Sequence, residues 1–510
     1  FSLVSASVPL VSNEDDFANA VLRTVALSLF TTIFTISGSF CLALTMISIS
    51  FYSRSGKALA FLLVPTLLGT TAGTYIFKTG FSGTWLLTYL MSGHQNFLYL
   101  SWTIVQFWQY GFLFTYLFWL SFRNIPQNRM EYSRSTGMPP WLIFRDIILP
   151  HLKNPVLLFT IICYSFVFYE DAKSSLLFYF SRGTGTELIA GWFQRVFQQY
   201  TAFQPVRQAA VLFFNYGSLM CILAVLILLM LTITLKLLIR SAESGTFLRH
   251  LNLVFKLLFV NIKLRKITAR GCLLLCFTPL LLGFIHASFN IRSAQSAILK
   301  SCLYTFLAAI FSTILAFFYS VLCRIAWREI LKEFNGRSIT IFVLTFSLYL
   351  LPPLCVYLVS FYWISMIGYG SQAALIVSWI FIHGLLNLPL LGGFLLAVHF
   401  AVRKQELEYS AAYRMSIFDV TRWSFWERFK LQYLLTLIFS FSVVWNDFGI
   451  NAVLSDQITS YASVLKMSFT GRGTSADAAT IYYMLSLLIT FGSVILWRTI
   501  ISKSEKIQLR

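Results

Sequence analysis

The sequence Glu-Tyr-Ser-Arg-Ser-Thr-Gly-Met at residues 131–138 recurs in altered form as Glu-Tyr-Ser-Ala-Ala-Tyr-Arg-Met at residues 408–415. The two stretches start 277 residues apart, and each lies in a basic segment between long apolar segments. At the same separation Glu170 corresponds to Asp447, at the end of the next apolar segment. A repeat of this size at a fixed spacing predicts a duplicated architecture with two membrane-embedded halves.

The composition indicates that lipid is the main solvent of the chain. Of its 510 residues, 57% are hydrophobic and 11% are charged, and the mean hydropathy is +0.73. A soluble domain of this length could not bury so much apolar surface. The formal net charge of +20 could suit a nucleic acid, but most of the 39 Lys and Arg residues lie in alternate segments between the apolar stretches. That one-sidedness is typical of cytoplasmic loops, so we expect membrane lipid and no nucleic acid as partner.

Apolar segments of about 20 residues predict membrane-spanning helices. The first half contains five, at residues 22–52, 57–78, 96–122, 154–172 and 208–238, and the second contains six, at 271–287, 297–323, 338–360, 374–402, 433–450 and 478–500. Residues 1–10 resemble the end of a further apolar segment, either a trimmed signal peptide or a truncated membrane helix, and the repeat favours the helix. We therefore predict an all-α membrane protein with two tandem repeats of about six helices, the first helix of the first repeat being truncated.

These segments divide the chain into a first repeat (1–238), a linker (239–270) and a second repeat (271–510). Within the linker, residues 246–266 interleave apolar and basic side chains. That pattern predicts an amphipathic helix on the cytoplasmic leaflet, or a helical linker. The eight cysteines form no Cys-x-x-Cys pair, and the six histidines are scattered singly, so neither a disulfide framework nor a metal site is predicted.

The segment 123–153 predicts a short cytoplasmic helix, a turn and a second helical stretch. Gly137 would permit the turn, because glycine adopts conformations that other residues avoid. The second stretch is expected to end near Pro150, and Pro155 to begin the next membrane helix. Such a rigid polar segment could receive a push from a soluble partner and pass it to both attached membrane helices.

This segment resembles the signature of ABC-importer permeases, Glu-Ala-Ala-x-x-x-Gly followed by a distal Ile-x-Leu-Pro. The residues that match it are Glu131, Gly137, Ile147, Leu149 and Pro150, whereas Tyr132 and Ser133 replace the two alanines. In the second half Glu408 matches and Arg414 stands where glycine is expected. The distal Ile, Leu and Pro are replaced there by Ser424, Trp426 and Glu427.

The resemblance extends over essentially the whole chain and is closest to type I permeases with two fused halves, such as those for ferric iron and thiamine. It implies a transport subunit, not an enzyme, in the bacterial cytoplasmic (inner) membrane, with both termini of the intact chain cytoplasmic. It also implies two copies of an ATP-binding subunit, which would carry ATP and Mg, and a periplasmic or extracytoplasmic solute-binding protein. The chain has no phosphate-binding Gly-x-x-x-x-Gly-Lys-Ser/Thr motif, so we expect no cofactor on it.

The resemblance assigns ATPase coupling to specific positions. In the first half these are Glu131, Tyr132, Arg134, Gly137, Ile147, Leu149 and Pro150, and in the second half Glu408, Tyr409, Ala411 and Ala412. No catalytic residue is predicted. Glu170, Asp171 and Asp447 lie near the outer ends of equivalent spans, where acids are costly and often functional. They would suit a cationic substrate, or instead cap helices, form interfacial salt bridges or contact the binding protein.

Two other functions remain open from the sequence. A gradient-driven secondary transporter or channel would need ionisable groups within the spans, and these are rare here. A membrane enzyme acting on lipid would need a catalytic cluster, and none is evident. Co-purification of a soluble ATPase would distinguish a permease from both.

Overall fold

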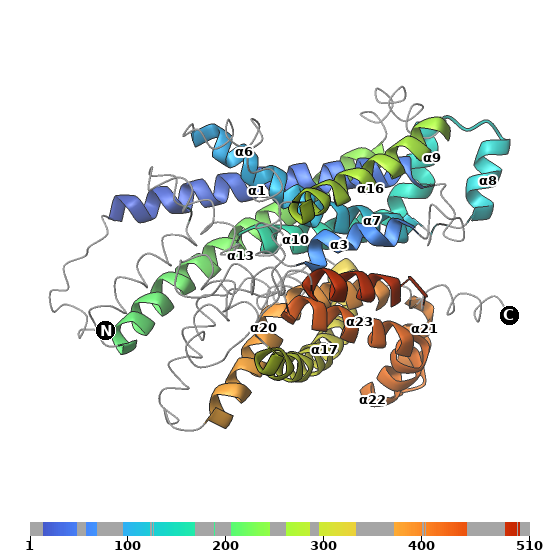
Figure 1. Ribbon diagram of the computed structural model, residues 1–510. Helices are drawn as coiled ribbons and strands as arrows, with labels where there is room; N and C mark the ends of the chain where they lie inside the picture. The colour runs from blue at the N-terminus through green and yellow to red at the C-terminus, as the bar shows by residue number, and fades with distance from the viewer. Residues whose placement is uncertain are drawn as a thin grey trace.

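The structure is a computed structural model of the 510-residue chain. It describes residues 14–47, 58–68, 95–122, 125, 127–168, 188, 206–244, 262–285, 295–332, 372–399, 402, 404–445, 485–496 and 498–499. Over these residues the chain is almost entirely helical and contains no strand (Figure 1).

Three described helices are long and apolar enough to cross a membrane. They are α1 (Glu14–Thr45), α13 (Val206–Ser244) and α17 (Gln295–Lys332), with qualifying segments Phe17–Thr45, Ile222–Ala242 and Cys302–Arg324. Shorter apolar helices lie beside them, at Ile267–Leu281, Ile376–Leu385, Gln432–Trp445 and Leu485–Leu496. The chain is therefore an all-α protein whose apolar helices indicate a membrane protein.

Helix α1 places its small and polar side chains inward and its large apolar side chains outward. The buried stripe recurs at helical spacing and consists of Ala20, Thr24, Ser28, Thr31, Thr35 and Ser39. Leu22, Phe30 and Ile33 are exposed. In water this pattern would be reversed, but in lipid small inward residues let helices approach closely while apolar residues face the acyl chains.

The first half contains further described helical elements besides α1 and α13. They are η1 (Ala60–Leu63), α3 (Val64–Leu67), α6 (Gln95–Gln106), the π-helix η2 (Phe107–Gly111), α7 (Phe112–Phe122), α8 (Gln127–Ser135), α9 (Pro140–Ile143), the π-helix η3 (Phe144–Ile148) and α10 (Leu149–Phe168). The α6, η2 and α7 elements follow one another without a gap, as the expected span 96–122 predicts.

The second half is also helical where it is described. Its described elements, besides α17 and the helix Leu485–Leu496, are α16 (Ile262–Ile285), α20 (Gln372–His399), α21 (Lys404–Ala412), α22 (Ile417–Val420), the π-helix η5 (Thr421–Trp426) and α23 (Glu427–Trp445). Helices α13 and α16 extend into the expected linker 239–270, whose central residues 245–261 lie outside the described part of the chain. The expected span 338–360 also lies outside it.

Helical structure does not stop at Pro150 but runs on from Pro140 to Phe168, with a bend of 54° between Lys153 and Pro155. The bend separates the segment Pro140–Lys153 from one that begins at Pro155, the residue expected to start the next helix. Proline lacks the backbone N–H and crowds the preceding turn, which favours a kink where neighbouring helices hold both segments. The bent pair Pro140–Lys153 and Pro155–Phe168 could form a fourth span by length and composition.

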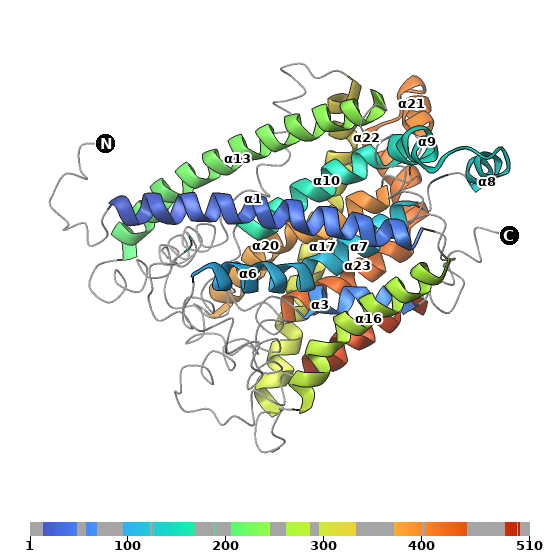
Figure 2. The same ribbon diagram turned by 90° about the horizontal axis from the view of Figure 1, so that it is seen from above.

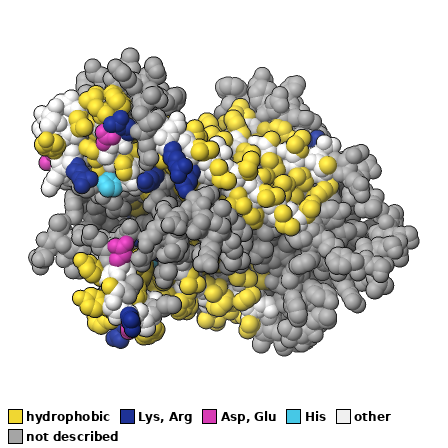
Figure 3. Space-filling view, turned by 180° about the vertical axis from the view of Figure 1, so that it is seen from behind, with side chains coloured by type: hydrophobic (Ala, Val, Ile, Leu, Met, Phe, Trp, Pro, Cys, Tyr) yellow, Lys and Arg dark blue, Asp and Glu magenta, His cyan; other side chains and the backbone are white. Residues whose placement is uncertain are grey.

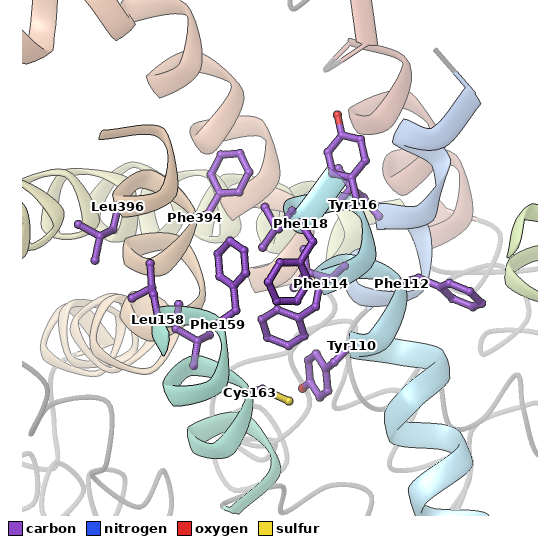
Figure 4. Close-up of a cluster of buried hydrophobic side chains, with 14 of the residues drawn as sticks. Tyr110, Phe112, Phe114, Tyr116, Phe118, Leu158, Phe159, Cys163, Phe394 and Leu396 are labelled. Carbon is purple, nitrogen blue, oxygen red and sulfur yellow. The ribbon is translucent and has the colours of Figure 1, made fainter. Parts of the chain in front are cut away.

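The two halves pack together through a cluster of large apolar side chains (Figure 4). Phe159 of α10 meets Phe118 of α7 with ring centroids 4.9 Å apart, and Phe394 of α20 belongs to the same cluster. At Gly393 an added Cβ would lie 2.5 Å from Ile162 Cδ1. The absence of a side chain at Gly393 therefore allows α20 to approach α10 closely.

Candidate functional site: two helical hairpins at one end of the bundle

The first helical hairpin, residues 127–153, begins with α8 and turns at Gly137. The Thr136 N–H donates to the Tyr132 carbonyl at 3.0 Å, and the Met138 N–H donates to the Ser133 carbonyl at 3.0 Å. Gly137 itself has a φ of 68°. A left-handed residue followed by a hydrogen bond back over five residues is the Schellman ending of a helix, as the glycine in the sequence predicts.

The second helical hairpin, residues 404–430, has the same turn although its sequence departs from the pattern. The Tyr413 N–H donates to the Tyr409 carbonyl at 2.9 Å, and the Met415 N–H donates to the Ser410 carbonyl at 3.0 Å. Arg414 occupies the glycine position with a φ of 52°. The hydrogen bonds around it hold a non-glycine residue in a conformation that is normally costly.

The helix that follows each turn starts by different means. In the first hairpin Pro139 and Pro140 precede and begin α9, where a missing N–H is harmless because the first helical N–H groups have no partner within the helix. In the second hairpin the Ser416 hydroxyl accepts a hydrogen bond from the Asp419 N–H at 3.1 Å and donates one to the Asp419 carboxylate at 2.6 Å. Two unrelated local sequences thus start a helix at the same position.

Each hairpin continues through a π-helix into the helix that enters the bundle. The Leu149 N–H donates to the Phe144 carbonyl, and the Glu427 N–H donates to the Arg422 carbonyl, both over five residues. Ile148 in η3 and Phe425 in η5 are fully buried. Short π-helical segments often occur at functional sites, so the pair at equivalent positions makes both junctions candidate functional positions.

The outer faces of α8 and α21 present tyrosine. Tyr132 is 70% exposed and Tyr409 is 65% exposed, whereas the next residues, Ser133 and Ser410, are 1% and 8% exposed. Glu131 is exposed, and Glu408 is half-buried. An exposed aromatic ring on a helix does not pack into the core of its own chain. It is therefore available for contact with a partner.

Both hairpins lie at the same end of the bundle in two perpendicular views (Figures 1 and 2). Helix α1 begins at the opposite end and finishes near this one. In the space-filling view hydrophobic side chains cover the middle of the visible face, while most visible Lys and Arg side chains gather toward the hairpin end (Figure 3). The hairpins therefore project from the polar end of an apolar bundle.

The second hairpin exposes more aromatic surface than the first. Its exposed large apolar side chains are Tyr409, Tyr413, Met415, Phe418, Trp423 and Trp426, whereas Tyr132 is the one such side chain described in the first hairpin. Arg145 and Arg422 occupy equivalent positions, and each guanidinium lies over a tryptophan, at 5.4 Å from Trp141 and at 5.6 Å from Trp423. A cation over the face of an aromatic ring is weakly attracted to it, and this attraction orients the guanidinium.

His151 on α10 lies close enough to Arg129 on α8 for the charge of one to affect the other. Partial burial lowers the pKa of His151 below the ordinary value of 6.5, and the positive charge of Arg129 lowers the pKa further. Both effects disfavour the charged imidazole. The imidazole is therefore mainly neutral at neutral pH.

The other predicted coupling residues occupy varied environments. Arg134 lies in α8, Ile147 is half-buried in η3, Leu149 is buried and Pro150 is exposed. Ala411 and Ala412 end α21, where Ala412 is exposed. Glu170, Asp171 and Asp447, predicted near the outer ends of equivalent spans, lie outside the described residues.

Contacts at the 277-residue separation continue from the hairpins into the bundle. Phe40 meets Phe122 with ring centroids 6.1 Å apart, and at the shifted positions Phe317 meets His399 at 6.4 Å. The Ile125 N–H donates to the Phe122 carbonyl at 3.2 Å, and the Val402 N–H donates to the His399 carbonyl at 3.0 Å.

Helix bounds and buried positions follow the same separation. The α6–η2–α7 segment runs from Gln95 to Phe122, and α20 runs from Gln372 to His399. In α1 the buried positions Ser28, Thr31, Thr35, Ser39 and Ala43 correspond to Thr305, Ala308, Ser312, Ala316 and Ser320 in α17, which are also buried.

Sequence reasoning missed two features that the structure brings forward. Trp102 and Trp379 stand at equivalent positions and are each 2% exposed. The 277-residue spacing alone would have identified this pair. Arg324 is buried in α17, where the apolar segment Cys302–Arg324 ends, and contacts the chain just before α21; no local motif in the sequence indicates that contact.

Within the described ranges, no group of three or more His, Cys, Asp or Glu side chains is placed to hold a metal ion. Comparison of the chain with protein-family models, with curated proteins and with solved structures finds no match.

Proposed function

We propose that this chain is the membrane permease of a binding-protein-dependent ABC importer, with two fused type I halves in a bacterial cytoplasmic membrane. A solute delivered by an extracytoplasmic binding protein would pass between the halves. Two separate ATP-binding subunits would supply the work by acting on the two hairpins. The chain would act as a transport subunit and catalyse no reaction itself.

One observation carries the proposal: two helix–turn–helix segments 277 residues apart share their backbone hydrogen bonds and lie at the same end of the bundle. Each is rigidly continued, through a π-helix, into a buried helix, α10 or α23. A force applied to α8 or α21 would therefore reach the apolar bundle without passing through a flexible connection.

The matched contacts in the bundle support duplication as the origin of both hairpins. A secondary carrier or channel needs no pair of rigid hairpins on one side, whereas a chain moved by two copies of one motor does. Closure of the ATP-bound subunits would shift the equilibrium between two arrangements of the halves. The size of that shift is limited by the difference in the free energy with which the subunits bind the two arrangements.

The turn geometry supports a role for both halves. Although Arg414 replaces the expected glycine, the second turn has the same hydrogen bonds as the first. The two hairpins differ instead in surface: the second offers Phe418 and Trp423 to a partner, and the first offers chiefly Tyr132. We propose that both bind an ATP-binding subunit, the second hairpin through the larger apolar contact.

Affinity purification of the tagged chain from its native membrane tests this function. We expect a soluble ATPase at two copies per chain, and we expect loss of it when Tyr132, Phe418 and Trp423 are all replaced by serine. A matched control replaces lipid-facing Leu226, Met230 and Leu237 of α13, which are also exposed, by alanine. Uptake that persists with no ATPase bound would instead favour the gradient-driven alternative.

A further inference from the structure

Two equivalent helices, the α6–η2–α7 segment and α20, turn the same positions toward lipid. Leu100 and Ile104 are exposed in the first, and Val377 and Phe381, at the shifted positions, are exposed in the second. Large apolar side chains on the outside of an apolar bundle face the acyl chains. The lipid-facing side of each helix is thereby fixed.

The opposite side of each helix carries buried aromatic and polar groups. Successive residues are separated by about 100° around a helix, so Trp102 lies about 160° from both Leu100 and Ile104. Gln106 follows one turn later and is also buried. In α20 the same positions hold Trp379 and His383, both buried, with ring centroids 4.2 Å apart. These side chains point toward the protein interior.

Several polar atoms on these inward faces have no hydrogen-bond partner among the described residues. They are Trp102 Nε1, Gln109 Oε1 and Asn387 Nδ2. Trp102, Gln109 and Asn387 are 2%, 1% and 6% exposed. Buried polar groups are nearly always hydrogen-bonded, and a membrane interior offers few alternative partners. Each of the two helices thus presents at least one buried hydrogen-bonding group that a ligand or water would complete.

We infer that these two inward faces line the solute path, and that the solute is a small organic molecule with a planar ring and hydrogen-bonding groups. The inference rests on the proposed function, because it takes the interior between the halves to be the route of transport. Trp102 and Trp379 would contribute one flat apolar surface from each half.

The chemistry of the lining groups sets this class of solute. An indole N–H donates, and the amides of Gln109 and Asn387 both donate and accept. None of these groups carries charge, so they would recognise a neutral substituent on the ring through the positions of their hydrogen-bond donors and acceptors. A bare metal ion or a polyamine would require compensating carboxylates, since burying an unpaired charge is far costlier than burying a paired dipole.

Cysteine labelling in sealed membrane vesicles tests the path. We replace Gln109 or Asn387 by cysteine and add a charged, membrane-impermeant methanethiosulfonate reagent. The matched controls are Leu100→Cys and Val377→Cys on the lipid-facing sides of the same helices. The unmodified chain, which contains eight cysteines, sets the background rate.

Both inward cysteines should react about tenfold faster than the lipid-facing pair or more, because a thiol must ionise in water to react. Equal rates on the two sides would overturn the path. This experiment needs no ATP-binding subunit, so its failure would leave the proposed coupling function untouched. Conversely, absence of an ATPase partner would not change the labelling.

Protection from the reagent tests the solute class. Nicotinamide and cytosine at millimolar concentration should each slow labelling of Gln109→Cys and Asn387→Cys, and leave the slow reaction of the lipid-facing controls unchanged. Ferric citrate and spermidine should have no such effect. Protection by either charged probe, or by neither ring compound, would overturn the assignment of a ring-bearing organic solute.

Discussion

The Arg324 guanidinium lies in α17, at the end of the apolar segment Cys302–Arg324, and donates a 2.9 Å hydrogen bond through Nη2 to the Val402 carbonyl oxygen, two residues before α21 begins. Its Nε donates a second bond, at 3.2 Å, to the His399 carbonyl. Ile47 occupies the equivalent position in the first half. The second hairpin is thus tied to α17 by a charged group, a connection for which Ile47 offers no side-chain donor.

Replacing Arg324 by methionine should destabilise the attachment of the second hairpin. Charge-assisted hydrogen bonds contribute about 1.5–3 kcal/mol each in proteins. The Val402 carbonyl would lose the guanidinium donor, and the His399 carbonyl would keep only the Val402 N–H. We expect faster proteolysis between α20 and α21 and a lower melting temperature in detergent. Arg324→Lys should recover only part of the loss, because one ammonium cannot reproduce the planar fork. Full recovery by lysine would contradict a bidentate role.

Substitutions at the left-handed residue of each turn should change the stability of the chain in opposite directions. Gly137→Ala places a Cβ on a left-handed residue and should cost about 1–2 kcal/mol, with no steric contribution because nothing lies within 4 Å of the added atom. Arg414→Gly relieves the same strain and, after the added entropy of an unfolded glycine, should stabilise by about 0.5 kcal/mol. Thermal unfolding of the purified variants measures both. Changes of the same sign would refute the shared geometry.

Truncating the exposed tyrosines should reduce transport without reducing stability. Tyr132→Ala and Tyr409→Ala remove rings that are mostly in water, so the melting temperature should change little. If the hairpins transmit the motion of an ATPase, the rate of solute-driven ATP hydrolysis should fall by about tenfold. A change of that size lies within the range that typical coupling free energies produce. Tyr132→Phe, which keeps the ring, serves as the control. Normal coupling in the double alanine variant would exclude the hairpins as the contact.

The pKa of His151 should respond to a change on α8. Arg129→Gln removes a nearby positive charge, so the pKa should rise yet stay below 6.5, because burial is the larger cause of its depression. In the folded chain the imidazole binds a proton less readily than in the unfolded chain. The first hairpin should therefore lose stability as pH falls through the ordinary value of 6.5. Histidine NMR titration of both proteins checks the direction. A pKa that falls in the variant would place Arg129 away from His151.

Much of the helical framework could be predicted from hydropathy. The expected spans 96–122 and 297–323 fall within α6–α7 and α17, because lipid selects uninterrupted apolar segments of a fixed length. The position of the first turn was equally accessible, since Gly137 is the residue that a left-handed helix ending favours. The position of the second turn was harder to predict, because Arg414 reaches the same φ range only with the support of its surrounding hydrogen bonds.

By itself, the sequence determined that the chain is helical and rich in apolar segments typical of a membrane protein, and where the two hairpins begin, because composition and residue order show these features without reference to which helices pack together. Only the tertiary structure decided that Pro155 bends a helix and that Arg324 holds the second hairpin. It also decided that Trp102 and Trp379 face inward. These outcomes depend on which helix packs against which, and in a chain that is apolar on nearly every face, hydropathy alone does not distinguish the side that meets protein from the side that meets lipid.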